Sequence, residues 1–220
     1  MIRELFSYAL EGKRIRASKN YSTKHLPSIN HCMRSRIKRQ FRTKLLKSLK
    51  EQKEVNRLEK SFIIQKKLFS LPEFIKAKII LFYLSFAGEV ETHRMVDKAV
   101  SLGKQVAVPV INKHKKKMMI PTFMANYGCE LEVGPYSIFQ PKKRHIKPVA
   151  LNKIDLIIVP AVAYDTQGNR LGRGQGYYDR FLNSLPKRIR TVGLAFDFQV
   201  FGDLPFIEPH DFGVDKVISA

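Results

Sequence analysis

The residues best suited to chemistry form a glycine-rich segment at 168–180, which reads Gly-Asn-Arg-Leu-Gly-Arg-Gly-Gln-Gly-Tyr-Tyr-Asp-Arg. Three of its glycines alternate along the chain, at Gly172, Gly174 and Gly176. Because glycine has no Cβ, such a backbone can adopt positive φ and bring its amide groups close to an anion. Arg170 and Arg173 can add charge-assisted, bidentate contacts to phosphate oxygens. We therefore predict a phosphate-binding loop; the alternative is a flexible glycine turn with solvated arginines.

The spacing of these glycines excludes two common nucleotide-binding loops. A Walker loop ends in Gly-Lys-Ser or Gly-Lys-Thr, which does not follow here, and the dinucleotide fingerprint spaces its glycines differently. The segment does precede a stretch expected to be helical, so a helix N-terminus would face the same anion. The sequence thus predicts a nucleoside triphosphate held by a loop of another kind.

The charge balance agrees with an anionic ligand but does not identify it. The 220 residues include 40 Lys and Arg against 19 Asp and Glu, a formal net charge of +21. Such a chain favours nucleic acid, phosphorylated small molecules, acidic substrates or anionic membranes. A basic tail on an ordinary domain would produce the same total. The hydrophobic share of 44% is enough for a sizeable core.

Membrane insertion, export and a disulfide framework find no support in the sequence. The longest apolar run, Ile79 to Ala87, is far shorter than the roughly 20 residues of a membrane helix. The N-terminal segment lacks the continuous apolar core of an export signal. Cys32 and Cys129 lie far apart and have no metal-ligand spacing around them. We therefore expect a soluble, cytoplasmic protein in a reducing compartment.

Residues 1–32 differ from the rest of the chain. They are rich in Arg, Lys, Ser and Asn, and their only acids are Glu4 and Glu11. A disordered basic arm, an organelle-targeting segment and sequence upstream of a true start at Met33 are the three interpretations. We favour a dispensable extension or a misplaced start over targeting, because a transit peptide should also be amphipathic. One catalytic domain is then expected over residues 33–220.

Regular patterns begin near Met33. Ile37, Phe41, Leu45 and Leu49 recur every four residues and predict one face of an amphipathic helix. A second helix should follow over 55–68, and Leu71-Pro72 should end it. The remaining elements are predicted as strands at 78–85, 105–110, 154–159, 191–196 and 214–218, a marginal strand at 118–124, an ordered loop at 126–148, and helices at 92–102 and 177–185.

Strands that alternate with helices in this way imply βαβ crossovers. The prediction is an α/β fold of three layers, with a mostly parallel open sheet and helices on both faces, as in Rossmann-like proteins. Ligands of such sheets bind outside the carboxyl ends of the strands. The segments Ser85–Glu91 and Ala161–Asp179 each follow a predicted strand, so we expect the site there.

The segment 160–182 closely resembles the signature of the 5-formyltetrahydrofolate cyclo-ligase family, also called methenyltetrahydrofolate synthetases. Three other segments are similar to elements of that family and occur in the expected order: Lys38-Arg-Gln-Phe-Arg42, Leu84-Ser-Phe-Ala-Gly-Glu-Val-Glu-Thr92, and Glu208-Pro-His-Asp211 with Val214-Asp-Lys-Val217. The resemblance runs from about Met33 to the end. Phe41 replaces a leucine of the family pattern, and Gln175 replaces a residue that is often Gly or Lys.

The resemblance implies an ATP-dependent ligase that converts 5-formyltetrahydrofolate into 5,10-methenyltetrahydrofolate, with release of ADP and phosphate. It implies ATP and a reduced folate as partners and Mg²⁺ as cofactor. Neither a membrane nor a specific nucleic acid is expected, and a monomer is predicted. Two alternatives are kept: a basic nucleic-acid-binding protein, and a relative that binds folate and nucleotide but turns over poorly.

The resemblance also assigns roles to residues by motif position. Lys38 and Arg173 are the expected catalytic groups. The ATP site is expected to comprise Lys38, Arg39, Gln40, Phe41, Arg42, Arg170, Leu171, Gly172, Arg173, Gly174, Gln175, Gly176, Tyr177 and Tyr178. Asp179 and Asp211 match the Mg²⁺ positions, which suits an ion that takes few carboxylates beside phosphate oxygens and water. The competing interpretations are solvated helix charges for Lys38 and Arg42, and a turn or cap residue for Asp211.

The folate site is expected to comprise Leu84, Glu89, Arg173, Gly174, Gln175, Gly176, Tyr177 and Phe196. In it, Glu89 should accept hydrogen bonds from pterin N–H groups, and Tyr177 and Phe196 should pack against the folate rings. An exposed loop acid and ordinary core aromatics are the alternatives.

Overall fold

The computed structural model describes residues 31–112, 118–124, 131–135, 138–186, 188–204, 207–208 and 211–220. The predicted N-terminal extension lies outside these ranges, except for its last two residues. The helices are α2 (His31–Glu51), α3 (Glu54–Phe69), α4 (Pro72–Lys76), α5 (His93–Ser101) and α6 (Tyr177–Asn183). Short 3₁₀ turns are η3 (Lys143–His145), η4 (Leu151–Lys153) and η5 (Asp197–Gln199).

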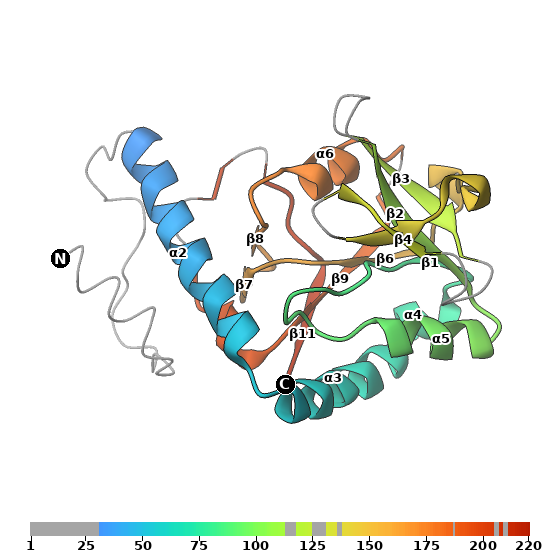
Figure 1. Ribbon diagram of the computed structural model, residues 1–220, viewed down its shortest axis with the longest axis horizontal. Helices are drawn as coiled ribbons and strands as arrows, with labels where there is room; N and C mark the ends of the chain where they lie inside the picture. The colour runs from blue at the N-terminus through green and yellow to red at the C-terminus, as the bar shows by residue number, and fades with distance from the viewer. Residues whose placement is uncertain are drawn as a thin grey trace.

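A six-stranded sheet forms the centre of the molecule, in the order β11-β9-β6-β1-β2-β3 (Figure 1). Its strands are β1 (Ile79–Leu81), β2 (Gln105–Asn112), β3 (Met118–Phe123), β6 (Leu156–Val159), β9 (Arg190–Ala195) and β11 (Lys216–Ser219). Every neighbouring pair is parallel except β2–β3, which is antiparallel. The mostly parallel α/β sheet and its marginal last strand are therefore confirmed.

Alternating side chains of these strands fill two separate cores. Ile80 and Ile158 belong to a core that also contains residues of α3, α4 and α5. Leu81 and Ile157, their neighbours along the strands, belong to a core that contains Phe181 of α6. Figure 1 shows α3, α4 and α5 on one face of the sheet and α6 on the other. This two-residue alternation gives the three layers, with helices on both faces.

Helix α2 packs on a second, smaller sheet through Phe41 and Leu45, while its Leu49 joins the core that lies between the main sheet and α3, α4 and α5. Strands β10 (Val200–Phe201), β7 (Ala163–Asp165) and β8 (Arg170–Leu171) form this sheet. The predicted helix face is confirmed, because Phe41 and Leu45 are buried against Leu171 and its neighbours. Arg42 directly follows Phe41, so this packing brings Arg42 beside Gly172 in the chain that leaves β8. Lys38 lies one turn earlier in α2 and contacts Asp211.

Several short elements were not predicted. The stretch 126–148 was expected to be a loop, yet its described part contains η3 and the hairpin of β4 (Leu131–Val133) and β5 (Phe139–Pro141). Strands of two or three residues carry too little alternation to be recognised from sequence. Pro72 follows the end of α3 as expected, but it also opens α4, where the first helical position needs no backbone N–H.

Within the ranges described above, no helix combines the length and apolarity needed to cross a membrane.

The loop over residues 85–92, which we call the Glu89 loop, touches the end of α2 at Gly88. Gly88 has a φ of +85°, and a Cβ placed on it would lie 2.0 Å from the carbonyl oxygen of Leu49. Only glycine allows both this conformation and this close approach. Gly88 therefore sets the distance between α2 and the Glu89 loop.

We expect Gly88→Ala to lower the free energy of unfolding by about 2–5 kcal/mol, because left-handed strain and a backbone clash add together. Gly103→Ala is the matched control, since Gly103 has a φ of +76° but nothing within 4 Å of its Cβ position. Its loss should be about 1–2 kcal/mol. Urea denaturation measures both variants, and equal losses would show that the contact with Leu49 is unimportant.

Candidate active site

A pocket of about 580 Å³ lies where the small sheet, α2 and the carboxyl ends of the main strands meet. Tyr83 and Leu84 follow β1, Pro109 and Ile111 lie in the last half of β2, and Pro160 follows β6. This is the position at which open parallel sheets bind ligands. The volume falls within the range of small-molecule sites, which is about 300–1,000 Å³.

The segment 172–176, which we call the glycine loop, forms one wall of the pocket. Gly174 and Gly176 have φ values of +94° and +65°, as glycine permits. Arg42 Nε donates to the carbonyl oxygen of Gly172 at 2.8 Å. A Cβ on Gly174 would lie 3.3 Å from the guanidinium carbon of Arg42. Burial lowers the pKa of Arg42, and the Asp211 carboxylate opposes that shift. Helix α2 and the glycine loop therefore hold each other.

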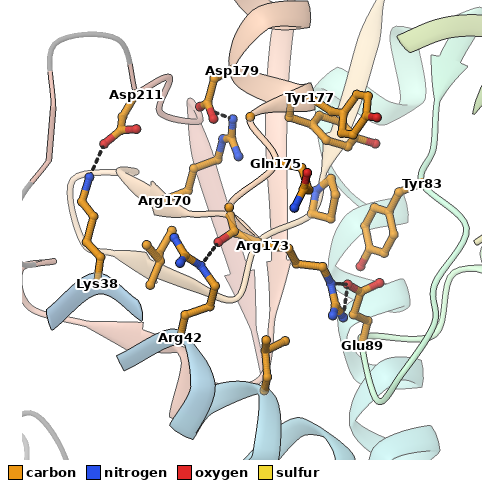
Figure 2. A pocket seen from close by; sticks show the side chains of 18 of the residues that line it. Lys38, Arg42, Tyr83, Glu89, Arg170, Arg173, Gln175, Tyr177, Asp179 and Asp211 are labelled. Atoms are coloured by element: carbon orange, nitrogen blue, oxygen red, sulfur yellow. Dashed lines mark hydrogen bonds and ion pairs between the residues drawn. The ribbon is translucent and has the colours of Figure 1, made fainter. Parts of the chain in front are cut away.

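Cations and carboxylates alternate at one end of the pocket (Figure 2). Lys38 Nζ lies 3.2 Å from Asp211 Oδ2 and 3.4 Å from Glu208 Oε1. Arg170 Nη2 donates to Asp179 Oδ1 at 2.6 Å, and the Arg170 side chain is only 2% exposed. The backbone N–H of Phe212 donates to the same Asp179 oxygen at 3.2 Å. Phe212, the residue after Asp211, thus bonds to Asp179, and this hydrogen bond links the two predicted Mg²⁺ positions.

These two aspartates fit a Mg²⁺ ion that arrives with phosphate. In the described ranges no group of three or more His, Cys, Asp or Glu side chains could hold a metal ion by itself. Mg²⁺ commonly takes one or two carboxylates and completes its shell with phosphate oxygens and water. Asp179 and Asp211 both line the pocket and offer the hard oxygen ligands that Mg²⁺ prefers. The residues present therefore match that type of site.

The opposite end of the pocket contains Glu89 (Figure 2). Its Oε1 accepts hydrogen bonds from Arg173 Nε at 2.9 Å and Nη2 at 2.8 Å, and its side chain is 8% exposed. The Arg173 guanidinium also lies 4.2 Å from the ring centroid of Phe86. Burial raises the pKa of Glu89, while the charge and hydrogen bonds of Arg173 act against that shift. The sequence predicted Arg173 both beside the phosphates and in the folate site with Glu89; its side chain points to Glu89.

Two tyrosines extend the wall near Glu89. Tyr83 and Tyr178 both line the pocket. Tyr83 donates to the carbonyl oxygen of Val90 at 3.4 Å. The Tyr178 hydroxyl is buried and has no hydrogen-bond partner among the described residues. Burial, with Glu89 nearby, raises the pKa of Tyr178, so its hydroxyl stays protonated at neutral pH. This wall can therefore donate hydrogen bonds but carries no negative charge of its own.

Most of the predicted site residues meet at this pocket. Its lining includes Lys38, Phe41, Arg42, Leu84, Glu89, Arg170, Leu171, Gly172, Arg173, Gly174, Gln175, Gly176, Tyr177, Tyr178, Asp179 and Asp211. Arg39 and Gln40 are exposed on α2 and are not among the lining residues. Phe196 is fully buried and stacks on Phe198, with ring centroids 5.8 Å apart. The structure thus places Phe196 in the core, away from the pocket surface.

Other lining residues had no predicted role. They include Tyr83, Phe86, Pro109, Ile111, Met119 and Glu208. The rule of strand ends, applied to the predicted strand at 105–110, would have found Pro109 and Ile111. Glu208 stands in a motif that was already noted. Met119 gave no signal, because it comes from the antiparallel strand β3.

Known proteins are similar to this chain in sequence and in fold. The sequence model of the 5-formyltetrahydrofolate cyclo-ligase family matches residues 34–220. A 5-formyltetrahydrofolate cyclo-ligase of Mus musculus is 30% identical over 188 residues, which cover 82% of this chain and 92% of that protein. The enzyme of that name from Escherichia coli K12 is 30% identical over 156 residues, covering 70% and 84%.

A solved structure agrees with these sequence matches. The NMR structure of Aquifex aeolicus 5,10-methenyltetrahydrofolate synthetase superposes with a TM-score of 0.72 and 32% identity, covering 83% of this chain and 89% of that one. With the family match over residues 34–220, this likeness leads to one conclusion: this chain is a member of the 5-formyltetrahydrofolate cyclo-ligase family.

Proposed function

We propose that the protein uses ATP to close the ring of 5-formyltetrahydrofolate, giving 5,10-methenyltetrahydrofolate, ADP and phosphate. The observation that carries this proposal is a pocket with a cationic end, a glycine loop and a buried carboxylate at the other end. The names of the relatives supply the folate substrate. A reaction between a triphosphate and a folate needs groups for both ligands in one pocket, and this pocket offers them.

The cationic end is suited to the ATP phosphates. Lys38 and Arg42 come from α2 and Arg170 from β8, and each donates to an oxygen of another segment of the chain. Phosphate oxygens that enter between them would meet positive groups whose orientation is already set, which lowers the cost of reorganisation. Glycine-loop N–H groups can add neutral donors to the same oxygens. We assign ATP binding to this end.

The Glu89 end is suited to the folate ring. A pterin carries several N–H donors, and a buried carboxylate is a strong acceptor for such groups. Arg173 keeps the Glu89 carboxylate in place and opposes the effect of burial on its pKa. Tyr83 and Tyr178, which line the pocket near Glu89, supply aromatic surface. We assign pterin binding to Glu89 and its neighbours.

ATP cleavage overcomes the chemical difficulty of this ring closure. A formamide carbonyl is a poor electrophile, and its oxygen is a poor leaving group. Transfer of the γ-phosphoryl group to the formyl oxygen releases ADP and activates the carbon. The folate N10 then attacks this carbon and loses its proton, and the C–O bond breaks so that the oxygen leaves as part of inorganic phosphate. Such a transfer depends on positioning and charge neutralisation more than on covalent help from the protein.

Asp179 and Asp211 are the residues that would hold Mg²⁺. When bound, the ion supplies charge neutralisation for the phosphate oxygens. Arg170 and the Phe212 N–H orient the Asp179 carboxylate, and Lys38 together with the Glu208 N–H orients Asp211. These contacts limit the rotamers of both aspartates before any ligand arrives.

Substrate labelled with ¹⁸O in its formyl group tests the reaction directly. We expect one labelled phosphate and one ADP for each methenyl product, because the formyl oxygen leaves bound to phosphorus. Absorbance of the methenyl product and mass spectrometry of the phosphate measure the two yields. Release of AMP, or label found only in water, would contradict the phosphorylated intermediate. A wild-type protein that forms no methenyl product would contradict the proposed function.

Glu89→Gln should raise the KM for folate about tenfold to a hundredfold and leave the KM for ATP nearly unchanged. The reason is the loss of a charged hydrogen-bond acceptor, which is worth about 1.5–3 kcal/mol. Glu91→Gln is the matched control, because Glu91 lies in the same loop but is not a lining residue. Steady-state kinetics with each substrate varied in turn gives both constants. An equal rise of both would indicate collapse of the loop instead.

Asp179→Asn and Asp211→Asn should each increase the Mg²⁺ concentration needed for half-maximal turnover, because each replaces a hard anionic ligand by a neutral one of similar shape. Titration of activity against free Mg²⁺ measures the effect. Asp197→Asn controls for the loss of charge alone, since Asp197 is exposed and lies outside the pocket. Wild-type titrations for both pocket variants would refute the metal assignment.

A further inference from the structure

The Glu89 loop is bound through its backbone by three polar side chains from the end of α2 and from α3. Gln52 Nε2 donates to the carbonyl oxygens of Leu49, at 3.0 Å, and of Gly88, at 3.1 Å. Arg57 Nη1 donates to the carbonyl oxygen of Glu89 at 3.3 Å. The hydroxyl of Ser61, which is buried, accepts a hydrogen bond from the Glu91 N–H at 3.0 Å. Three nearby peptide groups of the loop are therefore held from one side.

This binding matters because the loop is otherwise in an unfavourable conformation. Ala87 has a φ of 49° and Gly88 a φ of 85°, so two successive residues occupy the left-handed region. For alanine this conformation costs about 1–2 kcal/mol, and it persists only where the surroundings enforce it. Exchanged hydrogen bonds between Ser85 and Thr92 close the base of the loop. These two hydrogen bonds do not involve Gly88, at the tip of the loop, whose carbonyl oxygen is bound by Gln52.

The same helix serves both ends of the pocket. Lys38 and Arg42 lie in the first three turns and the middle of α2, at the cationic end, while Gln52 follows the last residue of α2 directly. The Gln52 amide bridges the last turn of that helix and the residue before Glu89. A shift of α2 relative to the loop would therefore break one of its two hydrogen bonds.

We propose that Gln52 is a positioning residue, which fixes the Glu89 loop to α2 and thereby sets the Glu89 carboxylate for its ligand. Gln52 is not among the residues that line the pocket, so it acts through the loop and not by contact with substrate. Ser61 supports the same loop from α3. This inference rests on the proposed function for the identity of the ligand, a reduced folate.

Gln52→Met tests the proposal, because methionine keeps the length of glutamine but donates no hydrogen bond. We expect the KM for 5-formyltetrahydrofolate, and its Kd measured by calorimetry without ATP, to rise about tenfold, as for the loss of roughly one hydrogen bond. The KM for ATP should change less than twofold. Gln65 is a half-buried residue of α3, and the same exchange there, Gln65→Met, should leave all three constants unchanged.

A double-mutant cycle separates positioning from general stability. If Gln52 acts through the Glu89 carboxylate, Gln52→Met should change folate affinity less than twofold in a Glu89→Gln background. The same factor in both backgrounds, or an equal rise for ATP and folate, would overturn the proposal. So would unchanged folate constants in Gln52→Met itself.

Ser61→Ala provides a second route if Gln52→Met does not fold. Ser61 and Ser48 both donate to the carbonyl oxygen four residues earlier, but Ser61 also accepts a hydrogen bond from the Glu91 N–H of the Glu89 loop. Ser61→Ala should weaken folate binding, and Ser48→Ala should not. Equal folate affinities of these two variants would refute the role of the contacts that Gln52 and Ser61 make with the Glu89 loop. A wild type that binds the folate without converting it would refute the proposed function, while calorimetry would still decide on Gln52.

Discussion

The ion pair between Arg173 and Glu89 joins the two loops from which the pocket is built. The two residues are 84 positions apart in the chain, and each lies in a segment with positive-φ residues and no regular structure. Burial disfavours the charge on Glu89, so the carboxylate needs a partner that is held close and in a fixed orientation. Arg173 supplies two N–H donors from the glycine loop and stacks on Phe86 of the Glu89 loop. The width of the pocket between the glycine loop and the Glu89 loop depends on this contact.

The cations at the other end are likewise paired before a ligand arrives. Lys38 contacts Asp211 and Glu208, and Arg170 contacts Asp179. Positive groups placed so close together would repel one another, and the interleaved carboxylates reduce that repulsion. This arrangement explains why the net charge of +21 could not identify a partner. Few of the basic residues line the pocket, whereas Arg34, Arg36 and many others are exposed to solvent.

Much of the fold followed from periodic patterns. The four-residue repeat of α2 and the apolar runs of β2, β6 and β9 are long enough to specify both the element and its buried face. The smaller sheet was not predicted, because β7, β8 and β10 depend on contacts from outside their own sequence. Gln199, a buried polar residue, donates to the carbonyl oxygens of Ala161 and Val162 beside β7. The β4–β5 hairpin similarly contacts β2 through Gln140, which accepts the Ile111 N–H at 3.2 Å.

The sequence by itself determined the family, the glycine loop and the residue types that gather at the pocket, because each is a local pattern. It also determined that Gly174 and Gly176 could take positive φ. Only the tertiary structure decided that Arg173 turns to Glu89, that Phe196 is buried in the core and that Gln52 bridges α2 and the Glu89 loop. The direction of a side chain depends on which distant backbone packs beside it, and local spacing carries no record of that packing.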